Sequence, residues 1–266
     1  MKIMVAIKQV ASLDEDFQIR PDGKDVEEEF LVRDLNEWDD FSLEEAMRIK
    51  ESSSEPVEVL AVCVGPPDVE EALRKCLAKG ADRAVRIWDE AVEGSDAIAI
   101  GRILAAAARR ESPALLFAGV QSSDQAFAST GVAAAALLGW PHAAVITKLD
   151  YSAGAASAVV QRELEAGVLH EMQIQCPAVL TIQLGINTPR YASLRAIKQA
   201  AGRPIEMLSP GELGMSAEQL GERGSASRVR RMYVPEKSRA RLLEGSVAEQ
   251  AAQLAQIIRE QTGGAA

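Results

Sequence analysis

The alternation of short apolar segments with longer helical patterns constrains the fold of this chain more than any other feature. The apolar segments, several of them rich in β-branched residues, lie at residues 3–9, 57–64, 84–88 and 114–118. Helical patterns separate them, from Asn36 to about Lys50, from Asp68 to Lys79 and from Ser95 to Arg110. Short strands that alternate with helices of this length are joined by β-α-β crossovers, which make neighbouring strands parallel. The sequence therefore predicts an α/β fold with a doubly wound, mainly parallel sheet.

The pattern changes after Trp140 and Pro141, where strand-like segments follow one another without intervening helices. Three of them lie at residues 143–149, 156–164 and 170–175, separated by turns that contain glycine and alanine. This spacing is typical of β-hairpins, so we expect hairpin strands added to the sheet. A further apolar segment, residues 178–184, is predicted to be the last core strand.

The C-terminal part differs from the rest in composition. From about residue 201 to Gly245, glycine, proline, serine and arginine dominate the sequence. A segment of this kind buries little by itself, so we expect residues 201–245 to form an extended arm that needs a partner surface. Residues 247–261 then show the apolar spacing of one amphipathic helix. We therefore predict an α/β domain in residues 1–200 and a C-terminal arm with its helix in residues 201–266.

The balance of charge limits the possible partners. The chain of 266 residues has a net charge of -10, which argues against binding to nucleic acid or to an anionic membrane surface. The charge is uneven, because residues 14–45 hold 14 acidic and 3 basic side chains, whereas residues 223–241 hold 7 basic and 1 acidic. Either both segments are simply solvated, or the basic segment lies on an acidic partner surface.

Several features favour a cytoplasmic location without membrane insertion. No apolar run approaches the roughly 20 residues of a membrane-spanning helix. The segment that begins at Met1 leads directly into a strand and lacks the cleavage site of a signal peptide. Cys63, Cys76 and Cys176 are an odd number at wide spacing, which indicates reduced thiols rather than a disulfide framework or a zinc site.

The residues that normally carry catalysis are scarce. The two histidines, His142 and His170, are not near other metal-ligating residues at ligand spacing, so we expect no metal site. The motifs of a nucleophile elbow, a P-loop and a dinucleotide fingerprint are absent from the sequence. Most carboxylates lie in first helical turns or acidic loops. The sequence therefore predicts a protein without catalytic residues of its own.

The segment from Gly119 to Gly131 is the strongest candidate for a binding site. It follows the apolar segment that ends at Ala118 and precedes an alanine-rich helix at residues 132–138. A strand end, a loop of small and hydroxyl residues, and a helix N-terminus together provide free N–H groups for a phosphate. Ser129 and Thr130 would add hydroxyl donors. The alternative is that these two residues only cap the helix and bind no ligand.

Two other strand ends are expected beside this loop. In a doubly wound sheet, ligands bind outside the carboxyl ends of the strands. The strand ends near Ala6 and Val64, together with the first turn of the helix that follows Asn36, would then complete a nucleotide pocket with the loop. The residues assigned to this pocket are Ala6, Asn36, Glu37, Trp38, Asp39, Val64, Val120, Gln121, Ser122, Ser123, Asp124, Gln125, Ala126, Phe127, Ala128, Ser129, Thr130 and Gly131.

A second informative segment runs from Asn187 to Arg195. Pro189 ends the last strand pattern, and Ala192 or Ser193 begins a short helix that reaches Ala200. Leu194 falls in the first turn of that helix. A leucine there usually packs in the core, and the alternative is an exposed apolar anchor that fills a pocket of a partner.

With these segments, the sequence resembles the β subunit of electron-transfer flavoproteins over essentially the whole chain. It is especially similar to the branch from methylotrophic bacteria that serves trimethylamine dehydrogenase. The segments that carry the resemblance are residues 5–9 (VAIKQ), 36–46 (NEWDDFSLEEA), 79–83 (KGADR), 119–131, 139–141 (GWP), 176–181 (CPAVLT) and 187–194 (NTPRYASL).

The resemblance implies a heterodimer in which an α subunit holds the redox FAD. The β subunit would bind AMP as a structural nucleotide in the predicted pocket, and its C-terminal arm would wrap around the α subunit. Leu194, with its neighbour Tyr191, falls in the loop that docks the electron-donating flavoprotein dehydrogenase, such as trimethylamine dehydrogenase. Leu13 and Trp38 fall near positions that approach the flavin.

Some positions depart from the family pattern. Ala166 replaces a glycine, His170 replaces an acidic or amide residue, and Ser129 stands where relatives often carry glutamine. Thr130 and Gly131 are similar to the loop of the AMP-binding type rather than to the bifurcating branch, which holds a second FAD. The other hypotheses are a stand-alone adenine-nucleotide-binding enzyme and a nucleotide sensor of the same α/β class.

Overall fold

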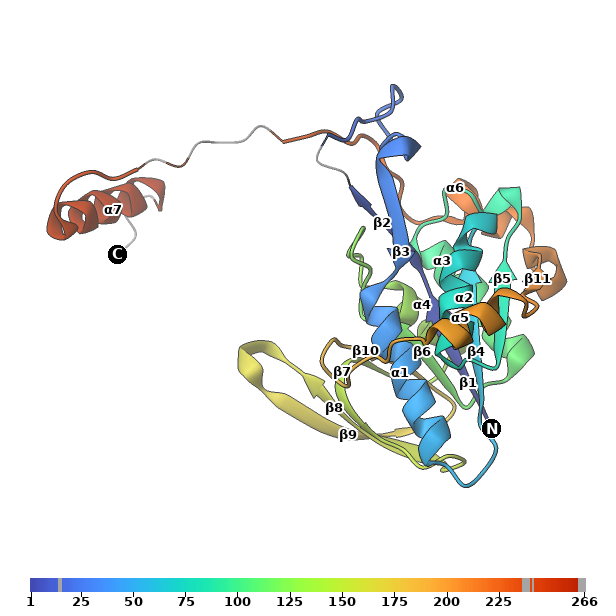
Figure 1. Ribbon diagram of the computed structural model, residues 1–266. Coiled ribbons are helices and arrows are strands. Elements are labelled where there is room, and N and C mark those ends of the chain that lie inside the picture. Colours follow the sequence, from blue (N-terminus) through green and yellow to red (C-terminus); the bar gives the residue numbers. More distant parts are fainter. Residues whose placement is uncertain (14–15, 236–239, 241, 263–266) are drawn as a thin grey trace. The chain divides into compact units, whose positions relative to one another are not determined.

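The computed structural model describes residues 1–13, 16–235, 240 and 242–262. The chain divides into two units, Met1–Arg230 and Arg231–Ala266. The first unit is built around a sheet with strand order β11-β5-β4-β1-β6-β10-β7-β8-β9 (Figure 1). The second contains one helix, α7 (Val247–Gln261), whose N-terminus is closed by a reciprocal capping box between Ser246 and Glu249.

The central strands are parallel, as the sequence predicts. The parallel strands are β1 (Lys2–Ile7), β4 (Glu58–Val64), β5 (Arg83–Ile87), β6 (Leu115–Gly119), β7 (His142–Asp150), β10 (Ala178–Ile182) and β11 (Glu206–Leu208). Two antiparallel strands, β8 (Ser157–Glu163) and β9 (Leu169–Gln175), extend the sheet beyond β7. The predicted fold class, a mainly parallel α/β sheet with added hairpin strands, is confirmed.

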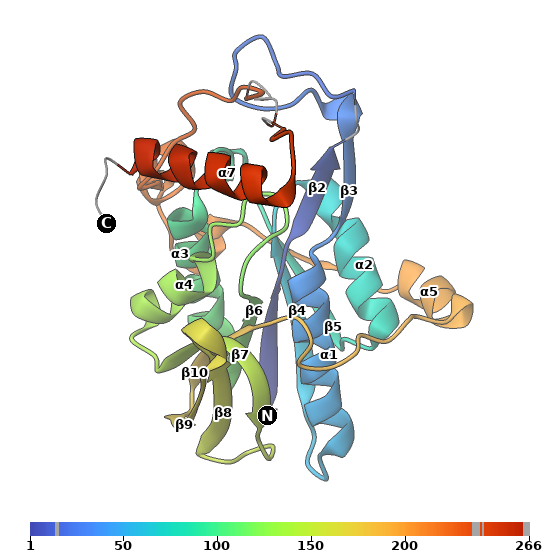
Figure 2. The same cartoon turned by 90° about the vertical axis from the view of Figure 1, so that its left-hand side faces the viewer.

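Helices cover both faces of the sheet because the buried strands are apolar on both sides. Two groups of helices lie on opposite sides of the sheet (Figure 2). On β1, Ile3 and Val5 face the core under the first group, whereas Met4 and Ala6 face the core under the second. The first group is α1 (Glu37–Ser52) and α2 (Glu70–Lys79), with α5 (Leu194–Ala201) packed on α2. The second group is α3 (Ala97–Glu111) and α4 (Thr130–Leu138).

The first predicted strand is interrupted in the structure. β1 ends at Ile7, and after Lys8 the chain continues as β2 (Gln9–Leu13), which pairs with β3 (Leu31–Leu35) in a separate antiparallel ribbon. Val10 is buried at the base of this ribbon, and Leu13 at its far end is exposed. The segment that was predicted as one strand therefore contributes to two sheets, and the division falls at the polar residues Lys8 and Gln9.

Residues 201–230 do not form the extended arm that we expected. β11 pairs with the edge strand β5, and Leu208 and Leu220 are buried in the core beside α3. The expectation was wrong here because a few apolar residues at the right spacing, with a free strand edge beside them, suffice to attach a segment rich in glycine and proline. The short helices of this segment are η5 (Pro210–Leu213), η6 (Ala217–Gln219) and α6 (Gly221–Gly224).

Short 3₁₀ helices complete the fold, and one of them contains a departure from the family pattern. They are η1 (Glu28–Phe30), η2 (Pro67–Val69), η3 (Glu90–Val92) and η4 (Glu165–Gly167). In η4, Ala166 has φ 59° and ψ 26°, which is the left-handed region that favours glycine. The local backbone thus keeps a conformation suited to the glycine that Ala166 replaces.

Candidate functional site

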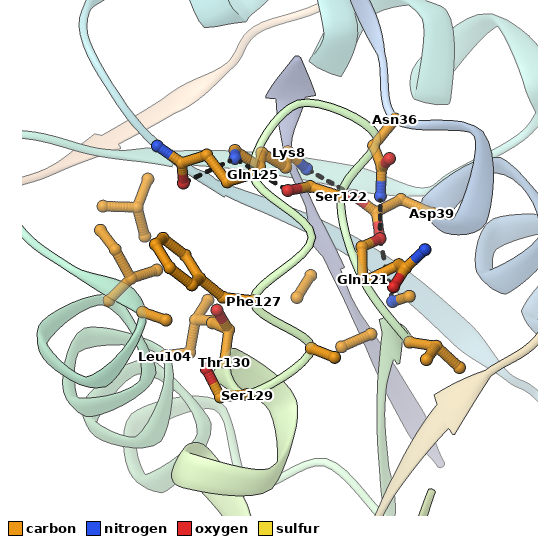
Figure 3. A pocket seen from close by; sticks show the side chains of 18 of the residues that line it. Lys8, Asn36, Asp39, Leu104, Gln121, Ser122, Gln125, Phe127, Ser129 and Thr130 are labelled. Carbon is orange, nitrogen blue, oxygen red and sulfur yellow. Dashed lines mark hydrogen bonds between the residues drawn. The ribbon is translucent and has the colours of Figure 1, made fainter. Parts of the chain in front are cut away.

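A cavity lies at the point where the strand order reverses. From β1 the chain passes through α1 to β4 on one side, whereas β5 leads through α3 to β6 on the other side of β1. The carboxyl ends of β1 and β6 diverge there, which is where open α/β sheets bind their ligands. The cavity has a volume of about 260 Å³, and its lining residues surround it in Figure 3.

Most of the predicted pocket residues line this cavity. They are Ala6, Asn36, Asp39, Val64, Val120, Gln121, Ser122, Gln125, Phe127, Ala128, Ser129 and Thr130. The other predicted residues, Glu37, Trp38, Ser123, Asp124, Ala126 and Gly131, do not line it. Gly131 lies inside α4, where an added Cβ would be 2.8 Å from Cγ2 of Thr181. Its role in the structure is to let α4 approach β10.

The sequence analysis missed one wall of the cavity. Ser95, Asp96 and Ala97 begin α3 and line the cavity together with Ile100 and Leu104 from the next turns. Asp96 caps α3 by accepting hydrogen bonds from the N–H groups of Ile98 and Ala99. The capping residue Asp96 was a usable signal for this wall, because it follows β5 and begins α3, the crossover helix that leads to β6. Lys8 also lines the cavity and was not predicted.

Asp39 joins the two strand ends that form the cavity. Its carboxylate accepts hydrogen bonds from the N–H of Lys8 at 2.7 Å and from the N–H of Gly119 at 2.9 Å. The side chain is 5% exposed, and this burial raises the pKa of Asp39 to about 7, although the hydrogen bonds act in the opposite direction. The carboxylate therefore bridges the ends of β1 and β6 from the first turn of α1.

Asn36 and Lys8 hold the loop after β6. The predicted capping residue Asn36 does not cap α1 with its side chain; its amide donates to the carbonyl of Gln121 at 2.9 Å instead. The ammonium of Lys8 donates to Asp124 at 2.6 Å. It also donates to Ser122 at 3.1 Å (Figure 3). Burial of Asp124 is outweighed by its hydrogen bonds to Lys8 and Ser122, which hold its pKa below the ordinary value.

The far end of the loop leaves hydrogen-bonding groups available at the cavity. Ala126 and Ala128 have φ values of 53° and 50°, an uncommon conformation for alanine that turns the chain sharply before α4. Ser129 precedes the first residue of α4, yet its side chain makes no capping hydrogen bond. For Ser129, the structure therefore does not support the alternative that its side chain only caps the helix.

The second predicted site is exposed. Tyr191 is 98% exposed and Leu194 is 80% exposed, so Leu194 is not a core residue. Ser193 caps α5 by accepting a hydrogen bond from the N–H of Ala196, which makes Leu194 the first helical residue as expected. Of the two residues assigned near a flavin, Leu13 is exposed at the end of β2, and Trp38 is half-buried and donates to Gln183 at 3.0 Å.

The described residues also bear on metal binding, membrane insertion and thiol chemistry. Among them, no three His, Cys, Asp or Glu side chains lie together in a way that could hold a metal ion. Within the same ranges, none of the helices combines the length and the apolar character that crossing a bilayer requires. The three cysteines are free, and burial raises the pKa of the Cys63 thiol to about 12.

Fold and cavity together define a doubly wound α/β protein with a cavity at its switch point. Comparison with known proteins is more specific. The family model described as "Electron transfer flavoprotein domain" matches residues 26–213. The chain is 64% identical over 263 residues to the electron transfer flavoprotein subunit beta of Methylophilus methylotrophus, which covers 99% of this chain and 100% of that relative.

More distant relatives agree. Identity is 37% over 213 residues to the mitochondrial electron transfer flavoprotein subunit beta of Arabidopsis thaliana, covering 80% of this chain and 83% of the relative. It is 31% over 217 residues to the human electron transfer flavoprotein subunit beta, covering 81% and 84%. This chain belongs to the electron transfer flavoprotein family as a β subunit, and the resemblance inferred from its motifs is confirmed.

Proposed function

We propose that this β subunit holds AMP in the cavity between β1 and β6 and pairs with an α subunit that carries the redox FAD. The heterodimer would accept electrons from a flavoprotein dehydrogenase of the trimethylamine dehydrogenase type. The observation that carries the nucleotide assignment is the cavity itself, because eight residues of the loop 120–130 line one cavity together with the strand ends near Ala6 and Val64. The chain would act in the cytoplasm as an electron carrier without catalytic residues.

The size and lining of the cavity favour AMP over a second FAD. Ligand pockets are commonly about 300–1,000 Å³ in volume, and this cavity of about 260 Å³ lies just below that range. FAD contains an FMN unit in addition to AMP and needs correspondingly more space. The phosphate would lie at the N-terminus of α4, where the first N–H groups and the hydroxyls of Ser129 and Thr130 can donate to it.

The heterodimer gives a role to the parts of the chain that the cavity does not explain. The α subunit would receive the second unit, Arg231–Ala266, whose helix α7 carries Val247, Leu254 and Ile258 at the spacing of one apolar face. The basic residues of the segment 223–241 would lie on an acidic surface of that partner. Leu13 and Trp38 would approach the flavin held by the α subunit.

Tyr191 and Leu194 would dock the dehydrogenase. A large apolar side chain that is 80% exposed at the start of a helix is a suitable anchor for a partner pocket. A single anchor with a polar surround suits a transient complex of small area, in which electrons pass and the partners separate quickly.

Co-expression with the α subunit tests the proposal. We expect a yellow heterodimer that releases one FAD and one AMP per pair on denaturation. In that heterodimer, Leu194→Ala should slow reduction by the dehydrogenase while FAD and AMP contents stay unchanged. A colourless monomer empty of nucleotide would refute the proposal. Turnover of a nucleotide would favour the stand-alone enzyme, and loss of nucleotide on dialysis would favour the sensor.

A further inference from the structure

We infer that Arg190, together with Glu44 and Glu51 of α1, is a positioning device that presents the docking side chains to the electron donor. We call these three residues the Arg190 clamp. This inference rests on the proposed docking role of Leu194 and adds residues that do not themselves touch the partner. It follows from how the segment 184–201 is attached to the rest of the protein.

The clamp is a dense set of charge-assisted hydrogen bonds. The guanidinium of Arg190 donates to Glu44 through Nε at 2.7 Å and through Nη2 at 2.9 Å, which is the paired geometry that only arginine provides. Nη2 also donates to Glu51 at 2.9 Å, and the Arg190 N–H donates to Glu44 at 3.1 Å. The hydrogen bonds to Glu44 and Glu51 raise the pKa of Arg190.

The position of Glu44 shows that the clamp is more than a surface ion pair. Glu44 is 7% exposed, and a buried carboxylate without its partner would lose several stabilising hydrogen bonds together. Next to it, the buried Glu45 accepts a hydrogen bond from the amide of Asn187 at 2.9 Å, and that amide also donates to the carbonyl of Phe41 at 3.0 Å. Two residues of the segment are thus fixed to one helix, α1.

The other end of the segment is attached to a different helix. Arg74 of α2 donates to the carbonyls of Ala200 at 3.2 Å and Ala201 at 3.0 Å, where α5 ends. The side chains between the two attachments point away from the body, because Tyr191, Leu194 and Ile197 are 98%, 80% and 50% exposed. The segment is therefore held at both ends, and its apolar side chains are free to enter a partner.

This arrangement has a kinetic consequence. A docking element that samples many conformations binds with an apparent affinity reduced by the fraction of time it spends in the competent one. The clamp keeps that fraction high without contributing to the electron-transfer step itself. Loosening it should therefore change the concentration of dehydrogenase that half-saturates the reaction, whereas the limiting rate at saturation should not change.

Arg190→Lys is the informative variant, because lysine keeps the charge but cannot make the paired hydrogen bonds. Arg83→Lys is the control: Arg83 of β5, like Arg190, donates to several carboxylates, here those of Glu58, Glu111 and Glu206, but it is not part of the docking segment. Both variants would be purified as heterodimers with the α subunit and mixed with reduced trimethylamine dehydrogenase in a stopped-flow instrument.

We expect Arg190→Lys to reduce the fraction of heterodimers with a docking-competent segment about tenfold. The half-saturating concentration of dehydrogenase should then rise about tenfold, whereas the limiting rate of reduction at saturation should not change. Arg83→Lys should leave both quantities unchanged. In a Leu194→Ala background, Arg190→Lys should add little, because the anchor that it positions is gone. Hydrogen exchange of the amides in residues 188–196, measured without the dehydrogenase, should become faster in Arg190→Lys only.

The outcomes separate this inference from the proposed function. If Leu194→Ala slows reduction but Arg190→Lys does not, the docking assignment stands and the positioning role is overturned. Equal effects of Arg190→Lys and Arg83→Lys, or full additivity with Leu194→Ala, would also overturn it, since either result indicates a general loss of stability. If Leu194→Ala has no effect, the docking assignment fails and this inference fails with it.

Discussion

Gly119 provides the sharpest test of how the cavity is built. It is the last residue of β6, and its N–H donates to the buried carboxylate of Asp39. A Cβ at this position would lie 2.5 Å from Cβ of Trp38 and 2.6 Å from Oδ1 of Asp39. Both contacts are closer than real Cβ atoms allow, so Gly119→Ala requires α1 to move away from β6.

The cost of this substitution can be estimated from the two effects it combines. Overpacking a close contact costs about 1–3 kcal/mol, because the neighbouring Cβ belongs to the first turn of a helix that is buried along one face. Weakening the hydrogen bond to Asp39 costs a further 1–3 kcal/mol or so, because the carboxylate is almost fully buried. We expect Gly119→Ala to lower the free energy of unfolding by about 2–6 kcal/mol in total.

Thermal unfolding of the heterodimer measures this loss. At about 2–4 °C per kcal/mol for a chain of this size, the melting temperature should fall by about 4–24 °C. The retained nucleotide should also decrease, because Gly119 and Asp39 both line the cavity. Gly202→Ala is the control: Gly202 has an ordinary negative φ, and its Cβ would meet only the carbonyl oxygen of Gln199 at 4.0 Å. Equal melting temperatures for the two variants would refute this account of the strand ends.

Three further predictions concern other parts of the chain. Burial raises the pKa of Asp39 to about 7, so between about pH 4 and pH 7 the folded chain keeps the carboxyl proton that the unfolded chain releases. The stability of the wild type relative to Asp39→Asn should therefore fall as the pH rises through that window. Denaturation profiles of the two proteins that stay parallel across this pH range would contradict this. Ala166→Gly should raise stability by about 0.5–1 kcal/mol because Ala166 has a left-handed backbone, whereas Gly167→Ala, at φ 72°, should lower it; urea denaturation of both variants checks the signs. Leu208→Ala should lower the free energy of unfolding by about 2–5 kcal/mol, because the Leu208 side chain is 6% exposed. Met207→Ala, whose side chain is 64% exposed, should lower it by less than about 0.5 kcal/mol. Similar urea midpoints for the two variants would mean that β11 does not pack on the first unit.

The central architecture could be predicted because each parallel strand is apolar on both faces and each crossover is long enough for a helix. The break at Lys8 was missed, because Lys8 and Gln9 are only two polar residues between Ile7 and Val10, and so short an interruption does not show that the flanking residues belong to different sheets. The attachment of residues 206–208 was also missed. A three-residue edge strand needs only a neighbouring edge and one buried side chain, here Leu208, and neither leaves a pattern in composition.

The candidate site was predictable to the extent that strand ends determine it. Knowing that ligands bind at the carboxyl ends was enough to bring Ala6, Val64 and the loop before α4 to one cavity. The sequence could not show which members of a continuous loop face inward, so Ser123, Asp124 and Ala126 were assigned with their neighbours but do not line the cavity. Alternating left-handed residues in the loop decide that, and alanine at those positions gives no warning.

The acidic residues of α1 were the least predictable feature, and they connect the two candidate sites. Carboxylates in an acidic segment are usually solvated, yet Asp39, Glu44 and Glu45 are each less than 10% exposed. Asp39 fixes the strand ends of the nucleotide cavity, and Glu44 and Glu45 fix the docking segment through Arg190 and Asn187. A rigid helix transmits a shift along its whole length, so a displacement of the first turn of α1 by Gly119→Ala should reach the Arg190 clamp. Slower docking in that variant, with Leu194 intact, is the result this connection requires, and an unchanged half-saturating concentration would show that the two sites are independent.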